Sequence, residues 1–255
     1  MKAQRTGGIR RQAAWRILVI LGCGWTTIAA AEPRDLERQT REFRVSVDGK
    51  ERGKCVMQLS RRDDGTDRVR IDSQLRFNYV VYDYRYSSSG TETWKEGRLI
   101  QLENTADYNG TKYVVKAGPA RKGLQVTVNG KASQNDADAW VTSYWHLPER
   151  LAPAGPVEGK KVVPAAGRRS EGGGEARVVP LLDSDKGRAL RGKLQFVGEE
   201  TISVAGHRKA CKRYRVAGDV QVELWYDDAQ RLVRQESVDE GHKTLLELVK
   251  LSEHP

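Results

Sequence analysis

The sequence predicts an all-β protein: a single antiparallel, strongly curved sheet or partly open barrel with one short helix. Four turn signals separate segments in which polar and apolar residues alternate, namely Asp48-Gly49, Asp64-Gly65, Asn109-Gly110 and Asn129-Gly130. These pairs favour tight hairpins because such turns need positive φ angles, which Gly, Asn and Asp adopt at the least steric cost. An apolar period of 3.6 residues is missing almost everywhere, so strands adjacent in sequence are expected to pair.

The first 31 residues have the three parts of a secretory signal: a basic leader, an apolar run of 12 residues (17–28) and small residues ending at Ala31. Twelve residues are fewer than the ~20 that a spanning helix needs, so the mature chain is expected to have no transmembrane span. We predict cleavage after Ala31 and export to the periplasm or the cell exterior. The stretch ILGC offers an alternative, in which Cys23 carries a lipid anchor.

The charge pattern after the leader is typical of a solvated surface. Five of the 44 basic residues and none of the 34 acidic residues lie in residues 1–31, which leaves 39 against 34 and a net charge of +5. Both signs are interspersed, as in RRDDGTDRVRID, whereas a nucleic-acid binder gathers positive charge on one face. We therefore expect no nucleic-acid partner.

The mature chain is interpreted as one β-rich domain, residues 42–251, between an N-terminal linker (32–41) and a C-terminal tail (252–255). Its two cysteines, Cys55 and Cys211, leave two alternatives. They form one bridge across a long loop, worth about 3–5 kcal/mol in an oxidising compartment, or they are two buried thiols far apart. Two cysteines and four scattered histidines do not suggest a zinc site, and no cofactor is expected.

Two segments interrupt the strand pattern. Residues 133–151 are expected to be helical or looped, with acids at the start and Pro148 near the end. In a helix, Trp140, Tyr144 and Trp145 would share one face. Residues 152–176 are rich in Pro, Gly and Ala, and they are expected to form a flexible excursion within the domain.

The candidate ligand-binding residues are aromatic. Residues 77–89 are interpreted as one strand with Tyr82, Tyr84 and Tyr86 on the same face. The other candidates are Trp94, Trp140, Trp145 and Trp225. These rings have two interpretations: they fill a β core, where each ring buries ~150–250 Å², or they line a concave face that holds an acyl chain, a glycan or a peptide.

The acids Asp227 and Asp228, beside Trp225, raise the question of a catalytic or metal-binding pair. An earlier copy of the pattern, ETWKEGRLI from Glu92, resembles ELWYDDAQRLV from Glu223, and it has Lys-Glu-Gly at the same bend. We therefore interpret the two acids as turn residues. The sequence has no nucleophile elbow, no H-E-x-x-H and no phosphate-binding loop, so no catalytic residue is predicted.

Three stretches carry a resemblance to a known family: SYWHLP, LLDSDKGRAL and YRVAGDVQVELWYDDAQRLVRQES. By them the chain, from about Phe43 to Leu248, resembles the exported bacterial family called domain of unknown function 6134 and, more distantly, domain of unknown function 3108. The resemblance implies an exported all-β domain with no established activity and no catalytic residues to transfer. It also implies a likeness to the curved half-barrels of periplasmic lipoprotein carriers, which bind acyl chains on a concave apolar face.

The combined expectation is a non-catalytic envelope protein that binds a lipid or another amphipathic ligand on the concave face of its sheet. Two alternatives stay open. The protein is a structural or assembly partner in the envelope, which predicts a flat exposed apolar patch. Or it is an enzyme acting on an envelope polymer, which predicts two carboxyl groups in one pocket, at least one of them with a raised pKa.

Overall fold

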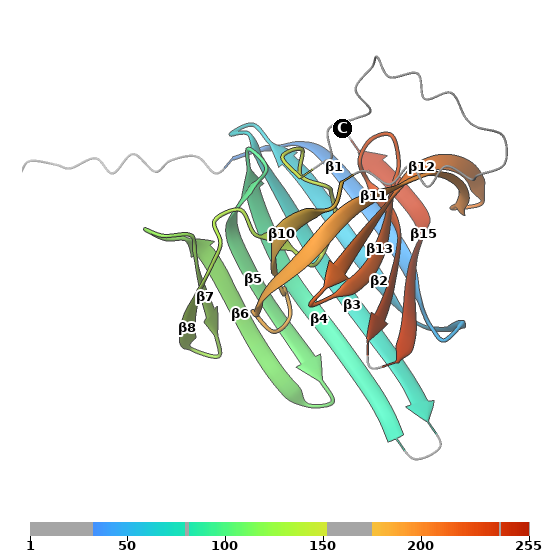
Figure 1. Cartoon of the computed structure of the whole chain (residues 1–255), viewed down its shortest axis with the longest axis horizontal. Coiled ribbons are helices and arrows are strands. Elements are labelled where there is room, and N and C mark those ends of the chain that lie inside the picture. Colours follow the sequence, from blue (N-terminus) through green and yellow to red (C-terminus); the bar gives the residue numbers. More distant parts are fainter. Residues whose placement is uncertain (1–32, 80–81, 152–174, 240, 255) are drawn as a thin grey trace, which may run out of the picture. The chain divides into compact units, whose positions relative to one another are not determined.

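A computed structural model of the chain describes residues 33–79, 82–151, 175–239 and 241–254, and every regular element in these ranges is a β-strand (Figure 1). The first eight strands are β1 (Asp35–Val47), β2 (Lys50–Arg62), β3 (Thr66–Tyr79), β4 (Tyr82–Lys95), β5 (Arg98–Tyr108), β6 (Thr111–Pro119), β7 (Leu124–Val128) and β8 (Lys131–Asn135). The others are β9 (Trp140–Val141), β10 (Arg177–Leu182), β11 (Ala189–Val204), β12 (His207–Gly218), β13 (Gln221–Tyr226), β14 (Leu232–Asp239) and β15 (His242–His254).

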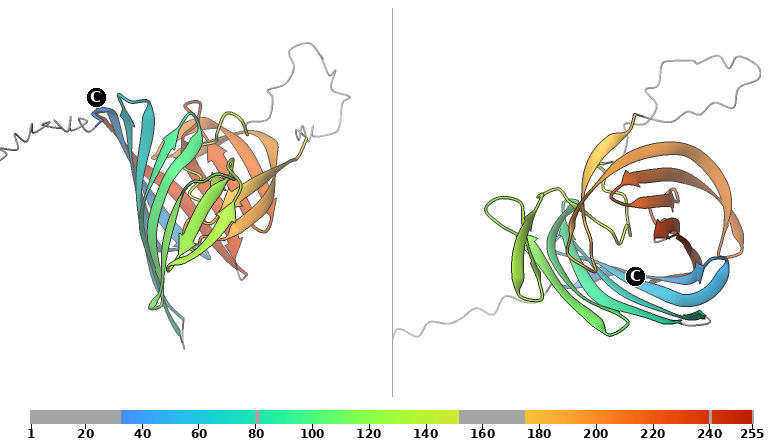
Figure 2. Two further views of the ribbon diagram at one scale, coloured as in Figure 1. Left: turned by 90° about the vertical axis from the view of Figure 1, so that its left-hand side faces the viewer. Right: turned by 60° about the horizontal axis from the view of Figure 1, so that its bottom comes forward.

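All 15 strands belong to one sheet with the order β8-β7-β6-β5-β4-β3-β2-β1-β15-β14-β13-β12-β11-β10-β9. Nearly every strand therefore pairs with its neighbour in sequence, as the turn signals predict, and all ladders are antiparallel except that between β9 and β10. The sheet curves strongly, but its edge strands β8 and β9 do not pair, so it is not closed (Figure 2). The prediction of a single, strongly curved antiparallel sheet is confirmed.

The predicted turns have the expected backbone. Asp48, Asn109 and Asn129 adopt φ angles of 50°, 53° and 47°, and each precedes a glycine with positive φ. Consecutive positive φ angles match the right-handed twist of the flanking strands, which is why these pairs close two-residue hairpins.

The chain ends belong to the sheet more fully than expected. β1 begins at Asp35, inside the stretch interpreted as a linker, and β15 runs to His254, inside the expected tail. These polar ends pair with each other, with Arg38 opposite His254. These ends are strands because each has a hydrogen-bonding partner. No local hydrophobic pattern in the sequence predicts this pairing.

Residues 77–89 were predicted to be one strand, and this is wrong. β3 ends at Tyr79 and β4 begins at Tyr82, with these two residues opposite each other across a hairpin. The rings of Phe77 and Tyr84 stack at 4.7 Å across the two strands. The hairpin has no Gly, Asn or Asp at residues 80–81, so its sequence reads as an uninterrupted strand.

The predicted helix near Trp140 is also wrong. Residues 136–151 form β9 and a series of tight turns in which Tyr144 N donates to Val141 O and Leu151 N donates to Pro148 O. Tyr144 has a φ of 49°, which is incompatible with a right-handed helix. Pairing of Trp140 and Val141 with β10 supplies the hydrogen bonds that a helix would otherwise make.

Several predictions fall outside the described residues: the secretory signal with cleavage after Ala31, the Cys23 anchor, and residues 152–174 of the excursion. Within the described ranges, no helix has the length and hydropathy needed to cross a membrane.

Candidate ligand-binding cavity

A cavity of about 300 Å³ lies against the inward face of the sheet, at the lower end of the size range of small-molecule sites. Its lining comes from β1 to β5, from β14 and β15, and from residues 142–143 and 183–185. The apolar part of this lining consists of Val45, Cys55, Met57, Ile71, Leu75, Leu102 and Leu246. The hydroxyl and amide side chains are Ser73, Tyr84, Tyr86, Ser88, Asn104, Tyr108, Thr142, Ser143, Ser184, Gln235, Ser237 and Thr244.

Strand register sets this mixture of side chains. Cys55, Ser73 and Ser88 are direct cross-strand neighbours, and the next inward row is Met57, Ile71 and Gly90. Alternate residues of a strand share a face, so each row places one side chain from each strand on the cavity wall. A Cβ atom at Gly90 would lie 2.4 Å from the side-chain oxygen of Asn104, so only glycine leaves room for that amide.

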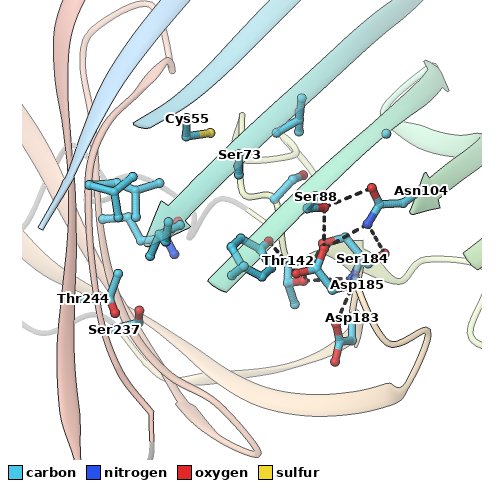
Figure 3. A pocket seen from close by; sticks show the side chains of 18 of the residues that line it. Cys55, Ser73, Ser88, Asn104, Thr142, Asp183, Ser184, Asp185, Ser237 and Thr244 are labelled. Atoms are coloured by element: carbon cyan, nitrogen blue, oxygen red, sulfur yellow. Dashed lines mark hydrogen bonds between the residues drawn. The ribbon is translucent and has the colours of Figure 1, made fainter. Parts of the chain in front are cut away.

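One carboxylate, that of Asp185, ties the loop between β10 and β11 to the cavity wall (Figure 3). Its Oδ2 accepts hydrogen bonds from the hydroxyl groups of Tyr86 and Tyr108 at 2.6 and 2.7 Å. Its Oδ1 accepts from Ser88 Oγ and Asn104 Nδ2, both at 2.9 Å. Four neutral donors from β4 and β5 therefore satisfy the carboxylate in place of a cation.

The loop that presents Asp185 is held in shape by Asp183. The Oδ1 atom of Asp183 accepts from the backbone N–H groups of Asp185 and Lys186 at 3.0 Å, and Oδ2 accepts from Arg188 Nε at 2.9 Å. This is the hydrogen-bonding habit that makes Asp a turn residue. Burial and the charge of Asp185 raise the pKa of Tyr86 and of Tyr108, so both hydroxyls stay protonated and remain donors.

A second carboxyl on the cavity wall, Glu92, has a different environment. It is 2% exposed, and its cross-strand neighbours Val69 and Leu102 are fully buried apolar residues. Trp94 Nε1 donates to Glu92 Oε2 at 2.8 Å. Burial raises the pKa of Glu92 to about 7, although hydrogen bonding by Ser143, Trp94 and Trp145 acts in the opposite direction.

The aromatic candidates are divided among three places. Tyr84 and Tyr86 line the cavity. Trp94 is buried beyond it, with its ring 6.3 Å from that of Trp145. The side chain of Tyr82 is outside the described residues.

Trp140 and Trp145 belong to the turns that follow β8. Both are buried, and the Trp140 indole donates to the carbonyl oxygen of His146 at 3.1 Å. Neither ring lines the cavity; Trp145 lines a second hollow at the opposite end of this segment. Their packing agrees with the core interpretation of the aromatic residues.

Trp225 lies on the outward face of the sheet. Its neighbour Leu224 is opposite Gln235, which lines the cavity, so the side chain of Trp225 points the other way. The guanidinium groups of Arg213 and Arg234 each lie 5.0 Å from its ring centroid. The ring is 3% exposed and therefore buried, as the core interpretation expects, but it lies on the side of the sheet away from the cavity.

The turn interpretation of Asp227 agrees with the structure. Its Oδ1 accepts from the backbone N–H groups of Ala229 and Arg231, and its Oδ2 accepts from Arg231 Nε at 2.9 Å. Asp228 is exposed. In the described ranges, no group of three or more His, Cys, Asp or Glu side chains is placed to hold a metal ion.

Cys55 and Cys211 are both free and buried, as in the second of the two alternatives. Cys55 belongs to β2 and faces the cavity, whereas Cys211 belongs to β12, five strands away in the sheet order. Burial raises the pKa of both thiols to about 11, so both stay in the protonated form.

A second hollow, of about 1100 Å³, has a different lining from the cavity. Its basic residues are Arg38, Arg41, Arg61, Arg150, Arg231, His146 and His254, and its acids are Glu37, Asp67, Glu96, Glu149 and Glu253. Arg41, 4% exposed, donates to Gln39 Oε1 and to the carbonyl oxygen of Trp145 at 2.6 and 2.7 Å. Two of the N–H groups of its guanidinium are thus bonded within the protein.

Glu92, Asn104 and Asp185 are not among the site residues that the sequence predicts. Glu92 begins the ETW pattern and Asp185 lies in LLDSDKGRAL, yet neither pattern tells which face of the sheet its acid takes. One signal for the site was present in the sequence: Ser88, Gly90 and Glu92 are alternate residues. In a strand they place two small residues and one acid on the same face.

Comparison with known proteins identifies the class first. The chain belongs to the family described as domain of unknown function (DUF6134), whose model matches residues 43–157 and 175–249. This confirms the family expected from the sequence. A comparison with curated proteins gives no match.

The fold is similar to a crystal structure titled as a beta-barrel-like protein of domain of unknown function DUF1849 from Brucella abortus. The TM-score is 0.59 with 10% sequence identity, and the match covers 88% of this chain and 98% of the other. At this identity the likeness shows a shared fold.

Proposed function

We propose that this protein is a non-catalytic binding protein whose cavity takes one small amphipathic molecule. The observation that carries the proposal is the division of the cavity wall into aliphatic side chains on β2 and β3, such as Met57, Ile71 and Leu75, and polar groups on β4, β5 and the 183–185 loop. Small-molecule sites have this construction: an apolar lining holds the body of the ligand, and a few placed polar groups orient it.

Export is part of the same proposal. It is supported by the basic leader, the short apolar run and the small residues before Glu32. A site that faces the periplasm or the cell exterior fits a ligand drawn from the envelope, whether the mature chain is free or anchored through Cys23.

The hydrogen bonding of the carboxylates favours binding over hydrolysis. Acid–base cleavage of a glycan polymer uses two carboxyl groups on either side of the bond. Asp185 is engaged by four donors and Asp183 by Arg188 and two backbone groups. Asp239, the other carboxyl group that lines the cavity with Glu92, is exposed at the end of β14.

The test is uptake of a fluorescent amphipathic probe, N-phenyl-1-naphthylamine, by the purified protein. We expect saturable binding to one site, and native mass spectrometry of the gently purified protein should show a bound small molecule. Ser73→Leu extends an aliphatic side chain into the cavity, so it should weaken probe binding about tenfold or more, since about 1.4 kcal/mol of lost contact is a tenfold change.

Ser87→Leu is the matched control, because Ser87 is an exposed residue on the outward side of β4. It should bind the probe like the unchanged protein. Absence of saturable uptake, or equal weakening by Ser73→Leu and Ser87→Leu, would overturn the proposal and favour an assembly role that uses the outer surface. Thermal melts establish that each variant is folded.

A further inference from the structure

The side chains in the described cavity lining that carry a formal charge are all acidic. Four carboxyl groups contribute to it, those of Glu92, Asp183, Asp185 and Asp239, and the described lining residues include no Lys, Arg or His. The whole chain has the opposite bias, with 44 basic and 34 acidic residues. The acidic character of the cavity is therefore a local property.

We propose that the cavity selects an amphipathic ligand with a cationic amine and that Glu92 is the residue that receives the ammonium group. This deepens the proposed function and rests on it. The amine would enter at Glu92, and the apolar body of the ligand would lie along the aliphatic wall made by β2 and β3.

The position of Glu92 gives an ammonium group the acceptors that it needs. Trp94 donates to Oε2, and none of the described residues donates to Oε1 with standard geometry. The Ser143 hydroxyl and the Trp145 indole lie close enough to Glu92 to lower its pKa, but neither makes a hydrogen bond of standard geometry, and the Ser143 hydroxyl is on the cavity wall. An ammonium has three N–H donors, so it can use the free carboxyl oxygen and the hydroxyl together.

The charges of the buried carboxylates also favour a cationic ligand. A buried carboxylate is stable only with a compensating charge or several donors, and Glu92 has no ion-pair partner among the described residues. Asp185 is bonded to Ser88, which lies about 13 Å from Glu92 along β4 at ~3.3 Å per residue, and it has four donors but no cation within hydrogen-bond distance. A bound cation would supply the missing positive charge.

None of the other described groups around Glu92 supplies the positive charge that would compensate its carboxylate. β3 and β5 place Val69 and Leu102 beside it. From the 142–147 segment, His146 lies near Trp94 with ring centroids 5.2 Å apart, and burial lowers its pKa to about 3, so it is neutral. Arg41, behind this segment, is bonded to Trp145 O and Gln39. Asp183 is paired with Arg188, and Asp239 lies exposed at the end of β14.

The experiment is a displacement series at pH 8 with three ligands of equal chain length: octylamine, octan-1-ol and octanoate, each competing with N-phenyl-1-naphthylamine. Octylamine is protonated at this pH, as a lysine amine is. We expect it to bind about tenfold or more tighter than octan-1-ol, with octanoate weakest, because one charge-assisted hydrogen bond is worth a tenfold change or more.

Glu92→Gln keeps the size and the bond to Trp94 but removes the charge. It should bring octylamine to the affinity of octan-1-ol while leaving the probe and the alcohol unchanged. Glu103→Gln, on the exposed outward side of β5, is the matched control and should retain the amine preference. Between pH 8 and pH 6, octylamine affinity should fall about tenfold in the unchanged protein, because protonation of Glu92 competes with binding, and should stay constant in Glu92→Gln.

The outcomes separate the two proposals. Probe and octan-1-ol binding without an amine preference overturns the amine inference and leaves the binding function standing. An amine preference that survives in Glu92→Gln overturns the assignment to Glu92. Failure of the probe and all three ligands to bind overturns the proposed function itself.

Discussion

Two hairpins of this sheet share a Glu-x-Trp pattern but present it to opposite faces. On β4, Glu92 and Trp94 point inward, where Glu92 lines the cavity. On β13, Glu223 and Trp225 point outward, and it is Leu224 and Tyr226 that face the interior. The same three letters therefore give a buried acid in one hairpin and a surface acid in the other.

The difference comes from the length of the turn. Glu96 and Gly97 alone connect β4 to β5, and Trp94 is opposite Leu99. The longer turn after β13 places Tyr226, rather than Trp225, opposite the matching Leu232. Because side chains alternate between faces, a shift of one residue reverses the environment of the whole strand.

The two acids therefore have opposite surroundings. Glu92 has apolar cross-strand neighbours and one indole donor. Glu223 is 19% exposed at its side chain and accepts from Arg213 and Arg215 at 2.7 and 2.6 Å. The two acids share the Glu-x-Trp pattern, so their positions on the sheet decide their different chemistry.

The largest effect should come from removing the two tryptophans. Trp94→Ala should lower the free energy of unfolding by ~3–5 kcal/mol, since it leaves a cavity among fully buried groups. Trp225→Ala should have about half that effect, because the long side chains of Arg213 and Arg234 can move into the space. Urea unfolding measures both, and a larger effect at Trp225 would contradict the inward–outward distinction.

The next effect is a dependence of stability on pH. The pKa of Glu92 is raised to about 7 in the folded state from the usual 4.5, so its contribution destabilises the fold progressively as pH rises through this interval. Glu92→Gln should therefore gain about 3 kcal/mol relative to the unchanged protein between pH 4 and pH 9. Melting curves across this range provide the measurement.

Glu223→Gln is the control for that experiment. Its two arginine partners are partly exposed, so the change should stay within about 1 kcal/mol and shrink in high salt. A pH-dependent gain of equal size in both variants would show that the inward position of Glu92 is not the cause.

A third prediction separates the adjacent acids of the longer turn. Asp227→Ala removes the acceptor of two backbone N–H groups and of Arg231, so it should lower the free energy of unfolding by about 2 kcal/mol. Asp228→Ala changes an exposed side chain and should stay within about 0.5 kcal/mol. Ligand binding should be unaffected in both, and a loss of binding in Asp227→Ala would reopen a functional role for that acid.

The sequence predicts the neighbour-to-neighbour sheet well because that topology is built by local turns. Asn109-Gly110 and Asn129-Gly130 carry their conformation in their residue types. The sequence between β3 and β4 has no such residues, and the turns around Tyr144 depend on pairing of Trp140 with a strand about 40 residues later, so both were missed.

The site is less accessible to sequence reasoning, since its parts meet only in the folded chain. Asp185 is 99 residues from Tyr86 and 81 from Asn104, and no local pattern relates them. The tyrosines on β4 could be named as candidates from composition alone. The chemistry of Glu92 could not, because it depends on which face the turn length assigns to it.

The smallest predicted effect concerns the short turn that sets this assignment. Glu96 adopts a φ of 51° before Gly97 at 70°, a conformation that Asn adopts at less steric cost than Glu. Glu96→Asn should therefore raise the free energy of unfolding by about 0.5–1 kcal/mol while leaving Trp94 opposite Leu99 and probe binding unchanged. Lys95→Asn, one residue earlier within β4, should be neutral or slightly destabilising because Asn is a poor strand residue. Equal stability changes in the two variants would mean that the turn carries no strain, and that the register of this hairpin is held by the packing of Trp94 alone.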